Sequence, residues 1–445
     1  MSIALSSLGL WDQTMTEGHN RNGVRTDRRA FLRRLGGATA LAAAGVAARR
    51  ALAEDAALDA LIGDTQRGSF GQGFDEASRT IHMPKASEPT VGAATAQTTE
   101  QAVERYAAIV AKGGWPQIAS VNMLQLGDRH PGVVPLRARL VASGDIDTNA
   151  AGTDVYDSYV LGAVRRFQAR HGITVDGIIR AETLAALNVP APLRLAQLKV
   201  NVTRLRALGA NLSPRYVVAN IPAARIEAIE NGVAVSRHTA VAGKPDRASP
   251  EINSKIVQIN FNPYWTVPPS IVQKDLIPKM QDQPDYLTKN HIRIFDSRQK
   301  ELEPSQINWY SSDATHYSFK QDPGSYNSLG SIRINFPSAY GVYMHDTPLK
   351  NLFGEDFRFH SSGCMRVQNV RQLVAWVLKD TRGWSLEDID RVIKSGERKD
   401  AQVAKPVPLH WVYITAWSGG DGVVQFREDI YGKDGLPGAQ AATSN

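Results

Sequence analysis

Residues 340–370, YGVYMHDTPLKNLFGEDFRFHSSGCMRVQNV, contain Cys364, the only cysteine among 445 residues. His345 lies 19 positions upstream, after an alternating run from Tyr340 to Met344 that predicts a strand with one buried face. Apolar residues at helical spacing follow the cysteine and predict a helix: Val370, Leu373, Val374, Val377 and Leu378. Cys364 is therefore expected in a turn between a strand and a helix, where a thiol can be both held and exposed.

A thiol becomes a nucleophile when a base or a cation turns it into a thiolate, and a histidine can serve as either. A lone cysteine is more often a small buried residue, and a histidine in a strand is more often structural. The neighbours of Cys364 favour chemistry, because they are polar and flexible: Ser361, Ser362, Gly363 and Arg366. We therefore expect a Cys/His nucleophilic site with an oxyanion-binding turn.

Several motifs in this chain resemble the L,D-transpeptidases with a YkuD-type catalytic domain. HDT at 345–347 and SSGCMR at 361–366 resemble the signature of that family. QDPGSYNSLGSIRINFP at 321–337 and NPYW at 262–265 are similar to segments of its large YcbB-type branch. The resemblance covers about residues 100–432. The commonest family pattern has histidine directly before the Gly-Cys pair, whereas this chain has Ser362.

The resemblance implies acyl transfer on peptidoglycan stem peptides, without a metal or other cofactor. His345 would deprotonate Cys364, which would attack the third residue of a stem and release the terminal D-alanine. An amine would then resolve the thioester and leave a 3-3 cross-link. Four acceptors remain open: a second stem peptide, water, a free D-amino acid, or a lysine of an outer-membrane lipoprotein. Carbapenem-type inhibitors are also implied.

Supporting roles follow from the same resemblance. The N–H groups near Gly363 and Cys364, with Ser362 beside them, would bind the oxyanion, since a serine-glycine turn leaves them free. The carbonyl near Asp346 would orient the imidazole, and Tyr343 would contact substrate. Arg366 would either position a stem carboxylate or brace the turn. His360 is a second histidine near Cys364, but no anchor is evident beside it, so His345 is the predicted base.

The N-terminus predicts export. DRRAFLR at 27–33 resembles a twin-arginine motif, and a weakly apolar run at 35–48 follows it. This run is too short to span a bilayer. ALA at 51–53 offers a cleavage site, so residues 1–53 are predicted to be a signal peptide that leads to the periplasm, with Met15 as an alternative start.

Charge and cysteine usage agree with export. Residues 1–53 hold eight arginines and three acids, so the remainder keeps 43 basic and 41 acidic residues. The excess of positive charge belongs largely to the signal, and no nucleic-acid partner is expected. A single cysteine cannot form an internal disulfide, and a free thiol in an oxidising compartment is a liability unless it has a function.

The rest of the chain predicts a multidomain α+β protein. Residues 54–99 read as a flexible linker, 100–125 as a helical scaffold segment, and 126–190 as a small three-helix domain. AVRRFQARHGITVDGIIRAETLAAL at 163–187 resembles a peptidoglycan-binding domain, although Arg180 stands where that family often has glycine. The alternative for this domain is a spacer without glycan affinity.

From Tyr216 onward the period of the apolar residues becomes two. Strands are expected at 216–221, 225–229, 233–241, 256–259, 332–336 and 340–344, with a last pair at 411–417 and 423–426. Glu230, Asn231 and Gly232 predict a hairpin turn. The β-rich catalytic domain is expected at 191–432, interrupted by a capping insertion at 268–321, with a disordered tail at 433–445.

Two other classes of protein remain open. A Cys/His peptidase such as an L,D-carboxypeptidase would cut stem peptides instead of joining them. A non-catalytic peptidoglycan-binding protein would need no reactive thiol.

Overall fold

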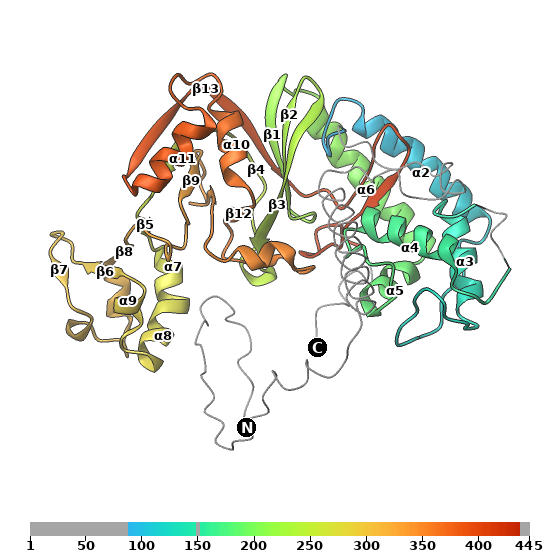
Figure 1. Ribbon diagram of the computed structural model, residues 1–445, viewed down its shortest axis with the longest axis horizontal. Coiled ribbons are helices and arrows are strands. Elements are labelled where there is room, and N and C mark those ends of the chain that lie inside the picture. The colour runs from blue at the N-terminus through green and yellow to red at the C-terminus, as the bar shows by residue number, and fades with distance from the viewer. Residues whose placement is uncertain (1–87, 148–151, 437–445) are drawn as a thin grey trace, which may run out of the picture. The chain divides into compact units, whose positions relative to one another are not determined.

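The computed structural model describes residues 88–147 and 152–436 (Figure 1). The predicted signal peptide at 1–53, with Arg28 and Arg29, and most of the predicted linker lie outside the described residues. No helix in the described part of the chain is long and apolar enough to cross a membrane.

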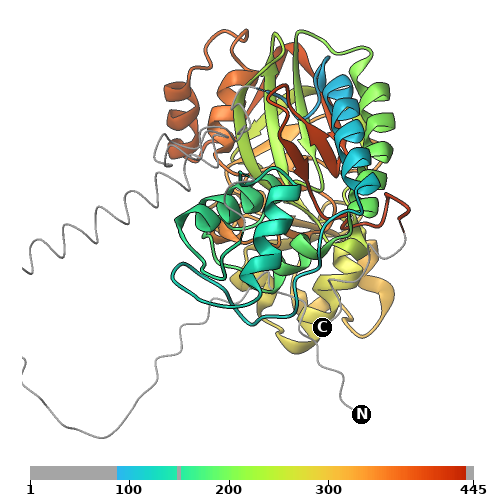
Figure 2. The same ribbon diagram turned by 90° about the vertical axis from the view of Figure 1, so that its right-hand side faces the viewer.

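Two long helices form the scaffold, α2 (Thr95–Ala111) and α6 (Ala191–Gly209). They lie side by side (Figures 1 and 2). Helix α2 starts before residue 99, and Thr90 and Val91 are already buried ahead of it. The predicted linker therefore ends earlier than expected. The apolar spacing that predicts this helix starts at Val103. The first turn of the helix is rich in threonine and shows no apolar periodicity, so the sequence did not place the start of the helix there.

The small helical domain consists of α3 (Val133–Ala142), α4 (Ser158–His171) and α5 (Ala181–Asn188), as predicted. The Asp157 side chain caps α4 by accepting hydrogen bonds from two amides of its first turn. Gly172 ends the helix at φ +70°, a conformation that favours glycine. Apolar residues from all three helices share one core that includes Leu136, Phe167 and Leu187.

The predicted catalytic domain is built on nine strands: β1 (Arg215–Asn220), β2 (Arg225–Glu230), β3 (Val233–Gly243), β4 (Ile252–Phe261), β9 (Ile332–Asn335), β10 (Met344–His345), β11 (Phe359–Ser361), β12 (Met365–Val367) and β13 (Lys399–Val412). Their order is β11-β3-β12-β10-β9-β4-β13-β1-β2, and β2 also pairs with β3. The pairings therefore return to β3, and the sheet closes on itself. Asn231 at φ 52° and Gly232 at φ 79° form the predicted hairpin turn.

Two helices follow the cysteine, α10 (Val370–Val377) and α11 (Leu386–Ser395). The predicted apolar face of α10 is buried. Short 3-10 turns lie at Pro245–Arg247 (η4) and Lys350–Gly354 (η8).

The chain ends its described part by returning to the scaffold. The hairpin β14 (Ala416–Ser418) and β15 (Val424–Phe426) shares a core with Tyr106, Trp115 and Leu198. Farther on, Asp434 is buried and accepts hydrogen bonds from Arg204 and Thr415. The prediction of a disordered tail from residue 433 is therefore wrong for its first residues, because the buried carboxylate of Asp434 is held by these hydrogen bonds.

The insertion folds as a unit of its own. The strand β5 (Trp265–Thr266), just before the insertion, forms a sheet with the insertion's own strands β6 (Ile292–Phe295), β7 (Glu301–Leu302) and β8 (Ser318–Gln321), in the order β5-β8-β6-β7. The helical segments of the insertion are α7 (Pro269–Ile271), η5 (Val272–Leu276), α8 (Ile277–Asp282), α9 (Tyr286–Lys289), η6 (Pro304–Gln306) and η7 (Ser312–His316). Among the aromatic residues of the insertion, Trp309 and Phe319 are buried, whereas Tyr310 is exposed. The yellow part of Figure 1 shows this unit.

Candidate active site

Strand β10 brings the predicted catalytic residues together. It pairs in parallel with β12, where His345 lies opposite Arg366, and antiparallel with β9, where His345 lies opposite Arg333. Met344 and Met365 are fully buried, so the alternation along these strands places the polar residues on the other face. One face of the sheet thus carries His345, Arg366 and Arg333. Tyr343 and Cys364 each come two residues earlier in the chain, before His345 and Arg366, and lie on the same face.

The strand itself is shorter than predicted. Only Met344 and His345 form β10, whereas Ala339 and Tyr340 form a turn that is followed by Gly341 at φ +63°. The alternating pattern does not reveal this turn, because the identities of Tyr340 and Val342 still fit a strand. The direction of His345 is unaffected, since β9 and β12 hold β10 from both sides.

Tyr343 is the direct polar neighbour of the thiol. Its backbone and hydroxyl both hydrogen-bond with Cys364 and favour the thiolate. Its ring lies 5.8 Å from the His345 ring and 4.2 Å from the Arg333 guanidinium, measured at the ring centroids. Among the described residues no hydrogen bond joins Cys364 to His345. Tyr343, predicted to contact substrate, therefore also connects the thiol to both the histidine and an arginine.

Burial dominates the ionisation of Cys364. It raises the pKa of the thiol to about 11, although Tyr343, Arg333 and Arg366 act in the opposite direction. The thiol is therefore protonated at neutral pH in the free protein, and its deprotonation requires a base within the site.

His345 is suited to be that base. Its Nδ1 lies 2.5 Å from the carbonyl oxygen of Asp346. A carbonyl only accepts hydrogen bonds, so Nδ1 carries the proton and Nε2 of the neutral ring is a free acceptor. Burial, and next the charge of Arg366, lower the pKa of His345 to about 3, which keeps the ring neutral.

The carboxylate of Asp346 is held from several sides. Its Oδ2 accepts hydrogen bonds from the backbone amide and the hydroxyl of Ser331, at 3.0 and 2.9 Å. Lys350 forms an ion pair with its Oδ1. Gly330 has φ +57°, and a Cβ atom there would stand 2.5 Å from Oδ2. These contacts fix the residue whose carbonyl orients the imidazole.

The turn before the nucleophile is closed by Ser361. Its hydroxyl donates to the Cys364 carbonyl at 2.5 Å and accepts from the Gly363 amide at 3.1 Å. The prediction that the Gly363 N–H is free for an oxyanion is therefore wrong, because Ser361 already occupies that donor. In the described part of the chain the Cys364 N–H has no hydrogen-bond partner, so it is the available donor. The Ser362 hydroxyl accepts a hydrogen bond from Arg247 at 3.0 Å.

Two arginines beside the thiol have unused donors. Arg366 is buried, and among residues 88–147 and 152–436 its Nε and Nη1 have no hydrogen-bond partner; the same holds for Nε of Arg333. Burial lowers the pKa of Arg366 to about 10. Arg366 does not brace the turn through these atoms, which favours the predicted alternative of an anionic ligand. Arg333 was not predicted as a site residue. The available signal was a charged residue between two apolar residues of a strand, Ile332 and Ile334, which are both buried.

His360 does have an anchor, contrary to the expectation from its neighbours. Its Nε2 lies 2.8 Å from both Oε2 of Glu355 and the carbonyl oxygen of Phe357. These contacts direct His360 toward residues 355–357, and the alternation along β11, in which the neighbouring Ser361 contacts the Cys364 carbonyl, places His360 on the side away from that turn. Elsewhere in the described residues, no group of three or more His, Cys, Asp or Glu side chains could hold a metal ion.

Comparison with known proteins gives matches in both domains. Residues 214–393 match the YkuD family model, described as "L,D-transpeptidase catalytic domain". Residues 129–187 match a model described as "Putative peptidoglycan binding domain". A Haemophilus influenzae protein named "Putative L,D-transpeptidase" is 32% identical over 239 residues, which are 54% of this chain and 48% of that protein. The chain thus spans about half the length of this curated relative.

Solved structures of L,D-transpeptidases are also similar. One from Stackebrandtia nassauensis is 11% identical, with 65% of this chain and 94% of that chain covered and a TM-score of 0.25. LdtMt1 in complex with imipenem is 16% identical, with 45% of this chain and 59% of that chain covered and a TM-score of 0.21. At these TM-scores neither alignment assigns a role to any residue here.

The strand arrangement around Cys364 and the family match define the class of this region. Residues 214–393 belong to the YkuD family of L,D-transpeptidase catalytic domains. A domain of the peptidoglycan-binding type precedes them at 129–187.

Proposed function

We propose that the protein is an L,D-transpeptidase that forms a thioester between Cys364 and a peptidoglycan stem peptide. The observation that supports this best is the shared face of β9, β10 and β12, where the thiol, a neutral histidine and two arginines with unused donors meet. This set supplies a nucleophile, a base and positive charge for an anionic peptide substrate.

In the acylation step Nε2 of His345 takes the proton of Cys364, and the sulfur attacks the carbonyl carbon of the third stem residue. The Cys364 N–H stabilises the oxyanion of the tetrahedral intermediate. The intermediate collapses, His345 returns the proton to the leaving nitrogen, and D-alanine departs. In the second step an acceptor amine attacks the thioester, loses a proton to His345 and releases the thiolate.

The arginines have two roles in this mechanism. Before attack, the positive charges of Arg366 and Arg333 stabilise the developing thiolate, since both lower the thiol pKa. The unused Arg366 donors bind a carboxylate of the donor stem. Its burial makes such an ion pair stronger than one at the surface.

The decisive experiment is acylation of Cys364. A carbapenem should form one covalent adduct with the purified protein, detected by intact-mass spectrometry, and Cys364→Ala should fold normally without forming it. An adduct of unchanged yield in Cys364→Ala would contradict the assignment. Imipenem is a reasonable probe, because it is the ligand in one of the similar structures.

The acceptor defines the product. Incubation with a disaccharide-tetrapeptide, followed by mass spectrometry of the muropeptides, distinguishes the alternatives. We expect a 3-3 cross-linked dimer. Tripeptide alone would indicate the L,D-carboxypeptidase reaction, and D-amino acid or lipoprotein-lysine adducts would require those acceptors in the mixture. An unmodified tetrapeptide with an inert thiol would favour a binding protein.

Export by the twin-arginine route to the periplasm belongs to the same proposal. It is supported by the DRRAFLR motif, the apolar run at 35–48 and the ALA site at 51–53, which all lie outside the described residues. Replacing Arg28 and Arg29 by lysine should leave unprocessed precursor in the cytoplasm. Unchanged processing of that variant would indicate another route.

A further inference from the structure

The loop after β3 runs along the turn that carries the nucleophile. The Lys244 amide donates to the Ser361 carbonyl at 3.0 Å. Arg247 Nη1 donates to the Ser362 hydroxyl at 3.0 Å, and the Ser249 hydroxyl donates to the Gly363 carbonyl at 2.9 Å. Three successive residues of the turn are thus held by one six-residue loop, 244–249.

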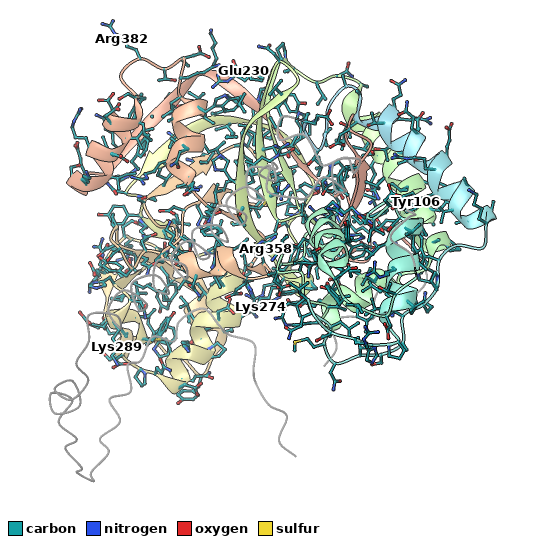
Figure 3. The ribbon with its side chains drawn as sticks, turned by 45° about the vertical axis from the view of Figure 1, so that its right-hand side comes forward. Tyr106, Glu230, Lys274, Lys289, Arg358 and Arg382 are labelled. Atoms are coloured by element: carbon teal, nitrogen blue, oxygen red, sulfur yellow. The ribbon has the colours of Figure 1, made fainter. Side chains whose placement is uncertain are left out.

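Arg247 also reaches into the insertion. Its Nη1 and Nη2 bind the two carboxylate oxygens of Asp275 at 2.6 and 3.0 Å. Asp275 lies in η5, directly after Lys274, which Figure 3 labels. Both side chains are largely shielded from solvent, with 15% and 23% exposed. A bidentate pair with this shielding has a defined geometry, unlike a single-contact pair at the surface.

One guanidinium therefore joins two separate parts of the site. Nη1 is shared between Asp275 and Ser362, so a shift of η5 moves the donor that fixes the Ser362 hydroxyl. Ser362 is two residues before Cys364, whose free N–H is the available oxyanion donor. Gly363 between them has φ +111°, so the backbone of this turn depends on its surroundings to hold it.

We propose that Arg247 is a positioning residue that couples the insertion to the nucleophile turn, with Asp275 as its partner in the insertion. The position of the insertion then sets the orientation of Ser362 and of the Cys364 amide. This inference deepens the proposed function and rests on it for its catalytic consequence.

The test is a double-mutant cycle between Asp275 and Ser362. Asp275→Asn, Ser362→Ala and the double variant are compared by the single-turnover rate of carbapenem acylation, in both the native and the Arg247→Gln background. We expect each single variant and Arg247→Gln to acylate roughly tenfold more slowly. The double variant should be no slower than either single variant, and in the Arg247→Gln background the two substitutions should have no further effect.

The chain offers a matched control. Arg293 binds Oδ1 of Asp322 through Nε and Nη2 at 3.0 and 2.7 Å, with 37% and 32% of the two side chains exposed, and it does not contact the turn. Asp322→Asn should acylate at the native rate. Arg247→Lys keeps the charge but loses the bidentate fork, and it should behave like Arg247→Gln.

Additive effects of Asp275→Asn and Ser362→Ala would overturn the coupling. Native acylation in Asp275→Asn, with a slow Arg247→Gln, would also overturn it, because Arg247 would then act without the insertion. Amide hydrogen exchange at residues 361–365 is measured on the same variants. Faster exchange in Asp275→Asn but not in Asp322→Asn supports the coupling even if no variant is acylated. Failure of the proposed function is recognised separately, by a native protein that forms no adduct.

Discussion

The Nδ1 atom of His345 lies 2.5 Å from the carbonyl oxygen of Asp346, the next residue in the chain. This contact sets the tautomer of the histidine, because the proton on Nδ1 leaves Nε2 as the acceptor. The ring of His345, the proposed base, is thus oriented by the backbone of the next residue.

Replacement of His345 should be far more damaging than replacement of His360. His345→Ala is expected to lose acylation by a factor on the order of 100 or more, the usual scale for removing a general base. His360→Ala should keep most of the rate, because the His360 Nε2 is directed to Glu355 and Phe357. Single-turnover acylation of both variants decides the matter, and a large loss at His360 with little at His345 would reverse the assignment.

The acylation rate should show no inflection near pH 6.5. The pKa of His345 is lowered to about 3 and the pKa of Cys364 is raised to about 11, so neither group changes its charge between these limits. Rates measured from about pH 5 to about pH 9 with a carbapenem of constant charge should be nearly flat. A step between pH 6 and 7 would show that the histidine titrates near its ordinary pKa, and would contradict its burial.

Acid should destabilise the fold through its buried histidines. The pKa of His238 is lowered by burial to about 4, so between its unfolded value near 6.5 and about 4 only the unfolded chain binds the proton. The stability that depends on the neutral ring is complete above pH 6.5 and falls with pH through this window, by about 1.4 kcal/mol per pH unit. Between about pH 4 and pH 6.5, His238→Gln should reduce the slope of the unfolding free energy against pH by the amount that corresponds to the uptake of one proton. Urea unfolding at several pH values measures it, and an unchanged slope would contradict it.

Gly330→Ala should impair the base by displacing Asp346. The new Cβ would stand 2.5 Å from the Asp346 carboxylate, and Gly330 also has φ +57°. We expect slower acylation and a loss of about 1 kcal/mol or more of stability. Gly341→Ala is the control, because Gly341 has φ +63° with no atom within 4 Å of the new Cβ. It should lose stability from backbone strain but keep its acylation rate, and equal rates in the two variants would argue against the role of Asp346.

Removal of either arginine should raise the pKa of the Cys364 thiol. Arg366→Gln and Arg333→Gln each remove a positive charge that favours the thiolate, and a charge at this range shifts a pKa by about 1 unit or more. The pH dependence of alkylation by iodoacetamide gives the thiol pKa directly. Arg371→Gln is the control, since Arg371 is half exposed and paired with Asp390. An unchanged thiol pKa in both test variants would contradict a role of these arginines in stabilising the thiolate, and substrate binding would remain as their only proposed role.

Deleting the insertion, residues 268–321, should change the product rather than abolish acylation. If the insertion shields the thioester, its loss admits water, and the ratio of hydrolysed tripeptide to cross-linked dimer should rise. Muropeptide analysis measures this ratio. A folded deletion variant with the native ratio would count against shielding.

Much of the fold follows from local sequence signals. The turn at Asn231 and Gly232 and the end of α4 at Gly172 are read from residues that favour positive φ. The apolar face of α10 is read from its period, and the proposed nucleophile and base are predicted from the motif around Cys364. These features depend on residues close together in the chain.

Other features could not be read in this way, because they depend on contacts between distant segments. Arg333 joins the site only through the register between β9 and β10. The Gly363 amide is occupied by the Ser361 side chain, which a serine-glycine sequence equally allows to point elsewhere. The sequence of the insertion is polar and irregular, yet the insertion takes part in a sheet. Its last strand, β8, pairs with β5, which directly precedes the insertion, and this pairing joins segments about 50 residues apart.

The hydrogen bonds between Ser418 and the start of α2 have a consequence for biosynthesis. Thr98 donates to the Ser418 carbonyl and the Ser418 amide donates to Thr99, across about 320 positions. The ribosome must therefore complete nearly the whole chain before α2 can bury Tyr106 against Phe426. Until then the apolar face of this early helix lacks its final partner, so the nascent chain is exposed to aggregation unless a chaperone covers it.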